Sequence, residues 1–120
     1  MNKISLSGRL TRDPELRSLP SGDAVCQLRL AVDNMAPGRK TGYVDVVCFG
    51  KPGEAAGRVL SKGWLVGVDG RLEHRTWEGK DGRKHEGYQV IGSVEFYARP
   101  RPTAETSPAE EDGDDGEVAA

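Results

Sequence analysis

Apolar and polar residues alternate one by one along parts of this chain, and that period of two constrains the fold more than any other feature. Residues 4–9 read ISLSGR and residues 24–33 read AVCQLRLAVD. In the second stretch the apolar side of the alternation consists of Ala24, Cys26, Leu28, Leu30 and Val32. Because successive side chains of a strand point to opposite faces, these stretches predict β-strands with one buried face.

Three more strands are expected, over residues 43–49, 64–72 and 88–97, with glycine-rich or charged turns between them. One helix is expected within residues 51–63, where Pro52 suits a first turn and Gly63 a C-terminal stop. Its apolar face would consist of Ala55, Ala56, Val59 and Leu60. Three strands, a helix and two strands match the order of an OB-fold, a five-stranded Greek-key barrel, although other small β-barrels also fit. The fold class predicted is all-β with one short helix.

Charge divides the chain into two parts. Residues 103–120 hold seven carboxylates and no lysine or arginine, which leaves 17 basic against 12 acidic residues upstream. Such a proline-containing, acidic segment has too little apolar surface to offset the entropy of ordering. We therefore expect one OB-fold domain over residues 1–98 and a disordered acidic tail over residues 99–120. The basic body favours a polyanion as partner.

Residues for catalysis or metal binding are scarce. His74 and His85 lie in a charged segment without a nucleophile or a metal-ligand partner at recognisable spacing, and Gly50-Lys51 lacks the glycine and hydroxyl of a phosphate-binding loop. Cys26 and Cys48 fall in predicted strands and suggest reduced, buried thiols. We expect no enzyme activity, no metal and no cofactor. Without an apolar run of about 20 residues or a leader segment, a cytoplasmic protein is expected.

Two basic, glycine-containing connections stand between the predicted strands, MAPGRKTG at residues 35–42 and EHRTWEGKDGRKHEG at residues 73–87. The second predicts a β-hairpin that extends from the barrel, with Asp81-Gly82 at its turn.

Aromatic residues stand next to basic ones in these regions. Tyr43 follows GRKT, Phe49 precedes Gly50-Lys51 and Trp77 follows Arg75. A base stacked on such a ring gains about 1–3 kcal/mol whatever its identity, while lysine and arginine bind phosphates. From pattern alone Phe49 could equally complete the core, and Trp64 could close the barrel or face another subunit, so Trp64 is left out of the site. The basic candidates are Arg39, Lys40, Lys51, Lys62 and Arg75.

The motifs resemble the bacterial single-stranded DNA-binding protein (SSB) family over about residues 2–98. The resemblance rests on NKISLSGRL, DPELR and the segment VDVVCFGKPGEAAGRVLSKGWLVGVDGRLEHRTW. It implies base stacking on Tyr43, Phe49 and Trp77, with Lys51, Lys62, Arg75 and also Lys3 along the DNA path. It further implies a homotetramer that acts in replication, recombination or repair, in the cytoplasm and at the nucleoid when bound to DNA.

The chain departs from the family pattern at three places. Residues 33–42 lack a tryptophan that some members carry there, and Trp64 replaces a residue that is commonly small or polar. The chain ends EDGDDGEVAA, without the Pro-Phe tip by which family members recruit replication and repair enzymes. These departures predict a specialised paralogue that recruits such enzymes poorly.

Three other functions are also compatible with parts of the pattern. An OB-fold that binds RNA or serves a replication-restart complex would keep the rings and the basic groove but not the tetramer. A protein-interaction barrel would use Trp77 and Tyr43 to anchor a partner protein. A nuclease is disfavoured because no carboxylate or histidine cluster has metal-site spacing.

Overall fold

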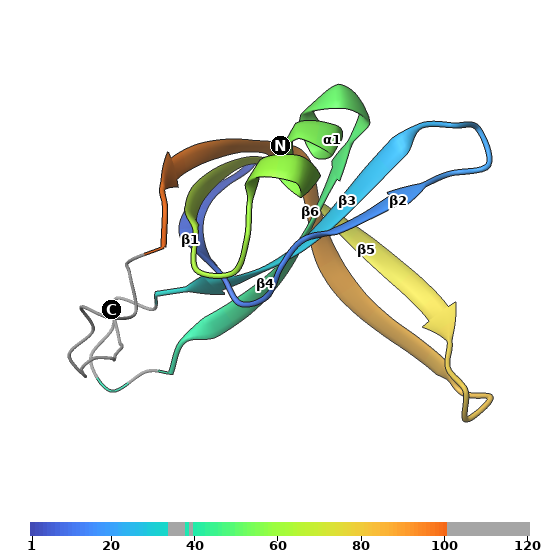
Figure 1. The fold of residues 1–120 in the computed structure, drawn as a ribbon. Helices are drawn as coiled ribbons and strands as arrows, with labels where there is room; N and C mark the ends of the chain where they lie inside the picture. Colours follow the sequence, from blue (N-terminus) through green and yellow to red (C-terminus); the bar gives the residue numbers. More distant parts are fainter. Residues whose placement is uncertain (34–37, 39, 101–120) are drawn as a thin grey trace.

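A computed structural model describes residues 1–33, 38 and 40–100 of the chain. Arg39 lies outside the described residues, and so does the predicted acidic tail from residue 101 onward. Six strands and one helix follow each other along the chain (Figure 1). They are β1 Ile4–Leu10, β2 Glu15–Ser18, β3 Ala24–Val32, β4 Gly42–Phe49, α1 Gly50–Val59, β5 Leu65–Glu78 and β6 Lys84–Ala98.

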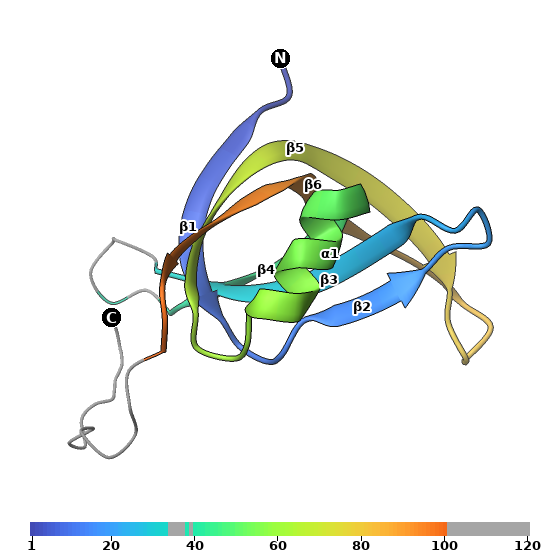
Figure 2. The same ribbon diagram turned by 45° about the horizontal axis from the view of Figure 1, so that its top comes forward.

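The strands form one sheet in the order β1-β5-β6-β4-β3-β2, and an additional pairing of β1 with β3 closes it into a barrel. Only β4 and β6 pair in parallel, and the other pairings are antiparallel. Helix α1 follows β4 in the chain and lies across the barrel beside β3 (Figure 2). This strand order with one inserted helix confirms the predicted OB-fold.

The strand count differs from the five expected because β2 was not predicted. All four residues of β2 are exposed. A strand without a buried side does not need to alternate apolar and polar residues, so its sequence carries no strand signal. This short strand pairs with the first part of β3, from Ala24 to Gln27, whereas β1 pairs with Leu30 and Ala31. Strands β1 and β2 thus share one edge of β3, and the ring of five strands is preserved.

The core consists of the side chains that point into the barrel. Its largest fully buried side chains are Leu28, Leu30, Val46, Val66, Val90, Cys26 and Cys48. Cys26 and Cys48 are direct cross-strand partners on β3 and β4, and both are free thiols as expected. Burial, with a smaller contribution from Cys48, raises the pKa of Cys26 to about 11, and burial also raises the pKa of Cys48.

The helix packs on only part of the face that was predicted, because two of the four residues of that face are buried. Gly53, Ala56 and Leu60 are buried, whereas Ala55 and Val59 are exposed. A methyl group on Gly53 would lie only 2.3 Å from the carbonyl oxygen of Cys48, so the helix backbone approaches the barrel at this glycine. Pro52 lies in the first turn as expected, but the helix ends at Val59, before the predicted stop at Gly63.

Trp64 lies against the barrel core. Its ring is half-buried and packs edge to face on Phe96, with the ring centroids 6.1 Å apart. This arrangement agrees with the reading in which Trp64 helps to close the barrel. No helix among the described residues is long and apolar enough to span a membrane.

Candidate nucleic-acid interface

The outward face of β4 presents two of the three predicted rings. Val46 and Cys48 point into the core, and Tyr43, Asp45, Val47 and Phe49 lie on the opposite side of the strand. Val47 is buried on that side, so the exposed rings stand toward its two ends. Tyr43 is 58% exposed and Phe49 is 45% exposed. The reading in which Phe49 completes the core is therefore wrong, and both rings are accessible on one side of one strand.

Strand β3 adds an arginine beside these rings. Arg29 is the cross-strand partner of Asp45, and its Nη1 lies 3.0 Å from the Asp45 carboxylate. The same guanidinium lies over the Tyr43 ring, 5.4 Å from its centroid. Farther along this face, Arg17 of β2 donates a hydrogen bond of 2.8 Å to Gln27. Among the described residues, the cation placed over a ring of β4 is therefore an arginine.

The third ring stands on the β5–β6 hairpin, which projects from the barrel (Figure 1). The two strands pair as far as Glu78 and Lys84, and Gly82 takes a positive φ of 76° in the connecting turn. Hydrogen bonds, from the Arg83 backbone N–H first and from His85 second, lower the pKa of Asp81. The predicted hairpin with Asp81-Gly82 at its turn is confirmed.

Trp77 is 41% exposed near the end of this hairpin. The Arg75 guanidinium lies over its indole at 4.4 Å from the centroid, and the His85 ring stacks on it at 5.7 Å with an interplanar angle of 21°. Gly87 leaves room for the indole, whose outer carbons lie 3.5 Å from where a Cβ would stand. The ring is therefore held by its own hairpin while part of it remains accessible to a ligand.

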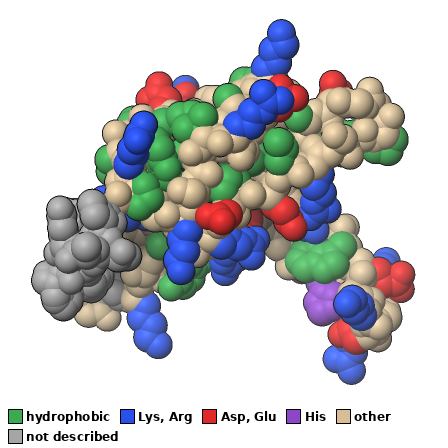
Figure 3. All heavy atoms as spheres, viewed as in Figure 1, with side chains coloured by type: hydrophobic (Ala, Val, Ile, Leu, Met, Phe, Trp, Pro, Cys, Tyr) green, Lys and Arg blue, Asp and Glu red, His purple; other side chains and the backbone are tan. Residues whose placement is uncertain are grey.

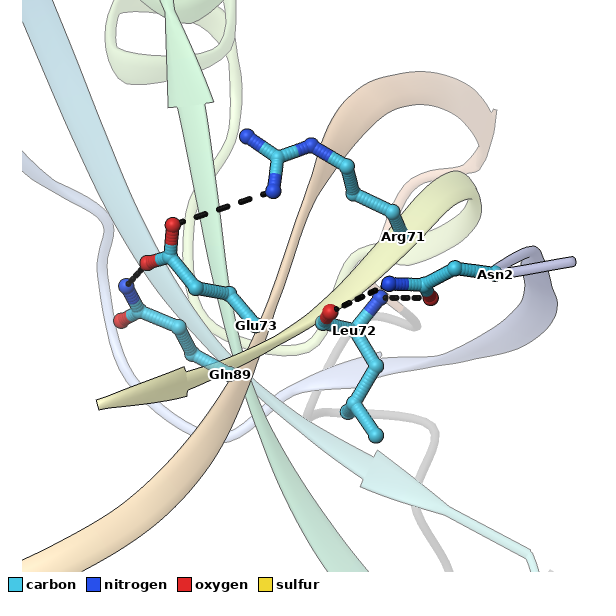
Figure 4. Close-up of polar contacts among 5 residues, drawn as sticks. All are labelled: Asn2, Arg71, Leu72, Glu73 and Gln89. Carbon is cyan, nitrogen blue, oxygen red and sulfur yellow. Dashed lines mark hydrogen bonds and ion pairs between the residues drawn. The ribbon is translucent and has the colours of Figure 1, made fainter.

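The base of the hairpin carries a polar cluster on the same side as Trp77. Glu73 accepts a hydrogen bond of 2.9 Å from Gln89 and lies 3.8 Å from the Arg71 guanidinium. Figure 4 shows these three side chains on one side of the strands, with Leu72 and the Asn2 amide that bonds its backbone on the other. Arg71 adds a further guanidinium to this face.

The predicted lysines are exposed, and none of those described is placed over an aromatic ring. Lys51 is in the first turn of α1, and Lys3 and Lys40 precede β1 and β4. Lys62 follows α1, and its backbone N–H donates to the Asp13 carboxylate at 2.8 Å. Among the described residues, the cations placed over aromatic rings are Arg29, Arg75 and Arg99.

Sequence reasoning missed Arg17, Arg29 and Arg71. The alternation of residues 24–33 shows that Arg29 points outward, but its closeness to Tyr43 depends on the register between β3 and β4. Arg71 and Trp77 lie an even number of positions apart on one strand, so their side chains point to the same side. That spacing is the signal that could have found Arg71.

The hairpin histidines pair with carboxylates. His74 lies 2.7 Å from Glu86 and stacks at a tilt on Tyr88, while His85 lies 3.3 Å from Asp81. Within the described part of the chain, no group of three or more His, Cys, Asp or Glu side chains is placed to hold a metal ion.

An OB barrel that presents accessible rings and arginines on one outward face has the features by which this fold binds single-stranded nucleic acids. The model of the single-strand binding protein family matches residues 1–97. The chain belongs to this family, as the sequence motifs predicted, and this membership supports single-stranded DNA as its partner.

Curated relatives agree with the family assignment. The chain is 45% identical over 101 residues to single-stranded DNA-binding protein 2 of Staphylococcus aureus, covering 80% of this chain and 72% of the relative. It is 38% identical over 109 residues to single-stranded DNA-binding protein 2 of Listeria innocua, covering 88% and 69%. A Bacillus cereus single-stranded DNA-binding protein is 39% identical over 105 residues, covering 84% of this chain and 62% of that protein.

Proposed function

We propose that this protein binds single-stranded DNA without sequence preference and protects it during replication, recombination or repair. The observation that carries the proposal is the presence of three accessible rings, of which Tyr43 and Trp77 each have a guanidinium over the ring. Each DNA base has a π-face, so bases stack on Tyr43, Phe49 and Trp77 whatever their identity. The protein performs no chemistry on the strand.

The phosphates are bound by the basic residues around these rings. Arg75 and Arg29 stand closest to the rings, and Lys3, Lys40, Lys51, Lys62 and Arg39 extend the positive surface in this proposal. Each phosphate that is neutralised releases condensed counterions, so binding weakens as salt rises. The bound strand is kept from re-annealing because its bases are stacked on protein.

We further propose that the protein works as a homotetramer. The free edge of β1 supports self-association, because residues 4–8 pair with β5 on one side and have no pairing on the other among the described residues. Unpaired strand edges are ready templates for pairing with a second chain. The assembly acts in the cytoplasm and associates with the nucleoid when it is bound to DNA.

Tryptophan fluorescence tests the proposal, because the chain has only two tryptophans. In Trp64→Phe the remaining indole is Trp77, and we expect long poly-thymidine to quench it strongly while a duplex of equal length does not. In Trp77→Phe the remaining Trp64 should show little quenching. Trp77→Ala should lose about 1–3 kcal/mol of binding free energy, which is the contribution of one stacked base.

Each variant is titrated at low and at high salt. Binding that ignores salt, or the absence of quenching by any strand, would favour a protein-interaction barrel over the proposed function.

A further inference from the structure

A carboxylate stands between the two rings of β4. Asp45 lies two residues from Tyr43 and four from Phe49 on the same outward face. Its side chain is 47% exposed, so it is accessible to a strand that stacks on both rings. A negative charge in this position repels phosphate, and the proposed DNA binding gives it no evident use.

The carboxylate is engaged with the one arginine that covers Tyr43. Asp45 Oδ1 lies 3.0 Å from Arg29 Nη1, within hydrogen-bond distance, and the Arg29 side chain is 39% exposed. The guanidinium is at the same time 5.4 Å from the Tyr43 centroid. Arg29 is therefore held over the ring by Asp45, and its Nη1 is already engaged by a carboxylate.

Other arginines of this face are paired in the same way. Arg17 lies 3.3 Å from Glu15, and Arg71 lies 3.8 Å from Glu73. On the side of the molecule that Figure 3 views, positive and negative side chains are interspersed rather than gathered into one basic patch. The face is thus partly neutralised by its own carboxylates.

We propose that Asp45 limits the affinity of the strand-binding face by holding Arg29, which a phosphate must take from it. Asp45 is a positioning residue that acts through Arg29, and the inference rests on the proposed function. Binding at this point is an exchange in which the guanidinium leaves one anion for another. Because both partners are more than a third exposed, the exchange needs no local unfolding.

A base-reading role for Asp45 predicts the opposite effect. A carboxylate accepts hydrogen bonds from the exocyclic amines of cytosine, adenine and guanine, and thymine has no such amine. Removing the charge would then weaken binding to poly-deoxycytidine and leave poly-thymidine unchanged. The two roles are separated by the sign of the effect.

The test compares Asp45→Asn with Glu54→Gln in the full chain. Glu54 is on helix α1 and lies 4.0 Å from Arg58, so its substitution removes the same charge from an ion pair outside the ring-bearing face. At low salt Asp45→Asn should bind poly-thymidine about two- to five-fold more tightly, the range expected for an exposed ion pair. Glu54→Gln should leave this affinity unchanged.

A double variant tests whether Asp45 acts through Arg29. Asp45→Asn is introduced into a protein that already carries Arg29→Gln. In that background it should tighten binding no more than Glu54→Gln does. Three results would overturn the inference. The first is tightening that persists without Arg29, and the second is equal affinity of Asp45→Asn and Glu54→Gln for poly-thymidine. The third is a loss of affinity that is confined to poly-deoxycytidine. None of these results contradicts the proposed function. If the wild-type protein bound no single-stranded DNA, both the proposed function and this inference would be wrong.

Discussion

At the scale of single residues, arginine provides the cations that contact the exposed rings. Arg29 lies over Tyr43 and Arg75 lies over Trp77. A planar, weakly hydrated guanidinium stacks on an aromatic face and still directs N–H donors to phosphate, which an ammonium does less well. The proposed site thus pairs a stacking surface with a phosphate donor in one unit.

The residues of this unit could be predicted only in part from the sequence. Tyr43, Phe49 and Trp77 were found because each lies next to basic residues in the chain. Nearness in sequence also found Arg75, which lies over Trp77, but it missed Arg29, which reaches Tyr43 from a neighbouring strand. Cross-strand partners depend on register, which alternation alone does not give.

The core thiols predict a pH dependence of stability. Burial raises the pKa of Cys26 from 9.0 to about 11 in the folded protein. The folded state therefore keeps a proton that the unfolded chain loses between these two values, so the free energy of unfolding falls as pH rises through this window. For this one group the loss is about 1.4 kcal/mol at pH 10, the equivalent of one pKa unit.

Denaturant unfolding at pH 7, 8.5 and 10 measures this effect, with Cys26→Ala as the reference. The variant is expected to be less stable at every pH because of the cavity that it leaves. Its stability should nevertheless fall less steeply above pH 8.5 than that of the wild type. Parallel curves for the two proteins would contradict the prediction.

At the scale of elements, the docking of α1 depends on one glycine. A methyl group on Gly53 would stand 2.3 Å from the Cys48 carbonyl oxygen, an atom of the backbone that cannot move alone. We predict that Gly53→Ala lowers the free energy of unfolding by about 1–3 kcal/mol, the usual cost of overpacking, despite the higher helix propensity of alanine.

Gly42→Ala is the matched control for this prediction. Gly42 begins β4, and a methyl group there would meet no atom within 4 Å. Its stability should stay within about 0.5 kcal/mol of the wild type, as for most surface changes. Thermal unfolding of the two variants compares them, and equal losses would show that the helix shifts to accept the methyl group.

The elements differ in how far they could be predicted from the sequence. Strands β1 and β3 were readable because burial on one side imposes alternation. Strand β2 has no buried face and was missed for that reason. The buried side of α1 was predicted only in part, because the helix approaches the barrel at Gly53, which has no side chain to mark a buried face.

At the scale of the whole molecule, affinity should depend on strand length. In a tetramer, a strand that is bound by one subunit meets the next at a high effective concentration, so a second contact costs little additional entropy. Such linkage multiplies affinity by about 10²–10⁴ once a strand spans two subunits. A single barrel gives only a shallow, statistical increase with length, because longer strands offer more overlapping sites.

Titration with poly-thymidine strands of increasing length distinguishes the two cases, together with light scattering of the free protein. We predict a steep rise in affinity between strands that occupy one subunit and strands that reach two, and a particle four times the mass of one chain. Monomer mass with a shallow rise would remove the tetramer but keep the stacking face. The free edge of β1 would then require some other protection, because an exposed strand edge promotes aggregation.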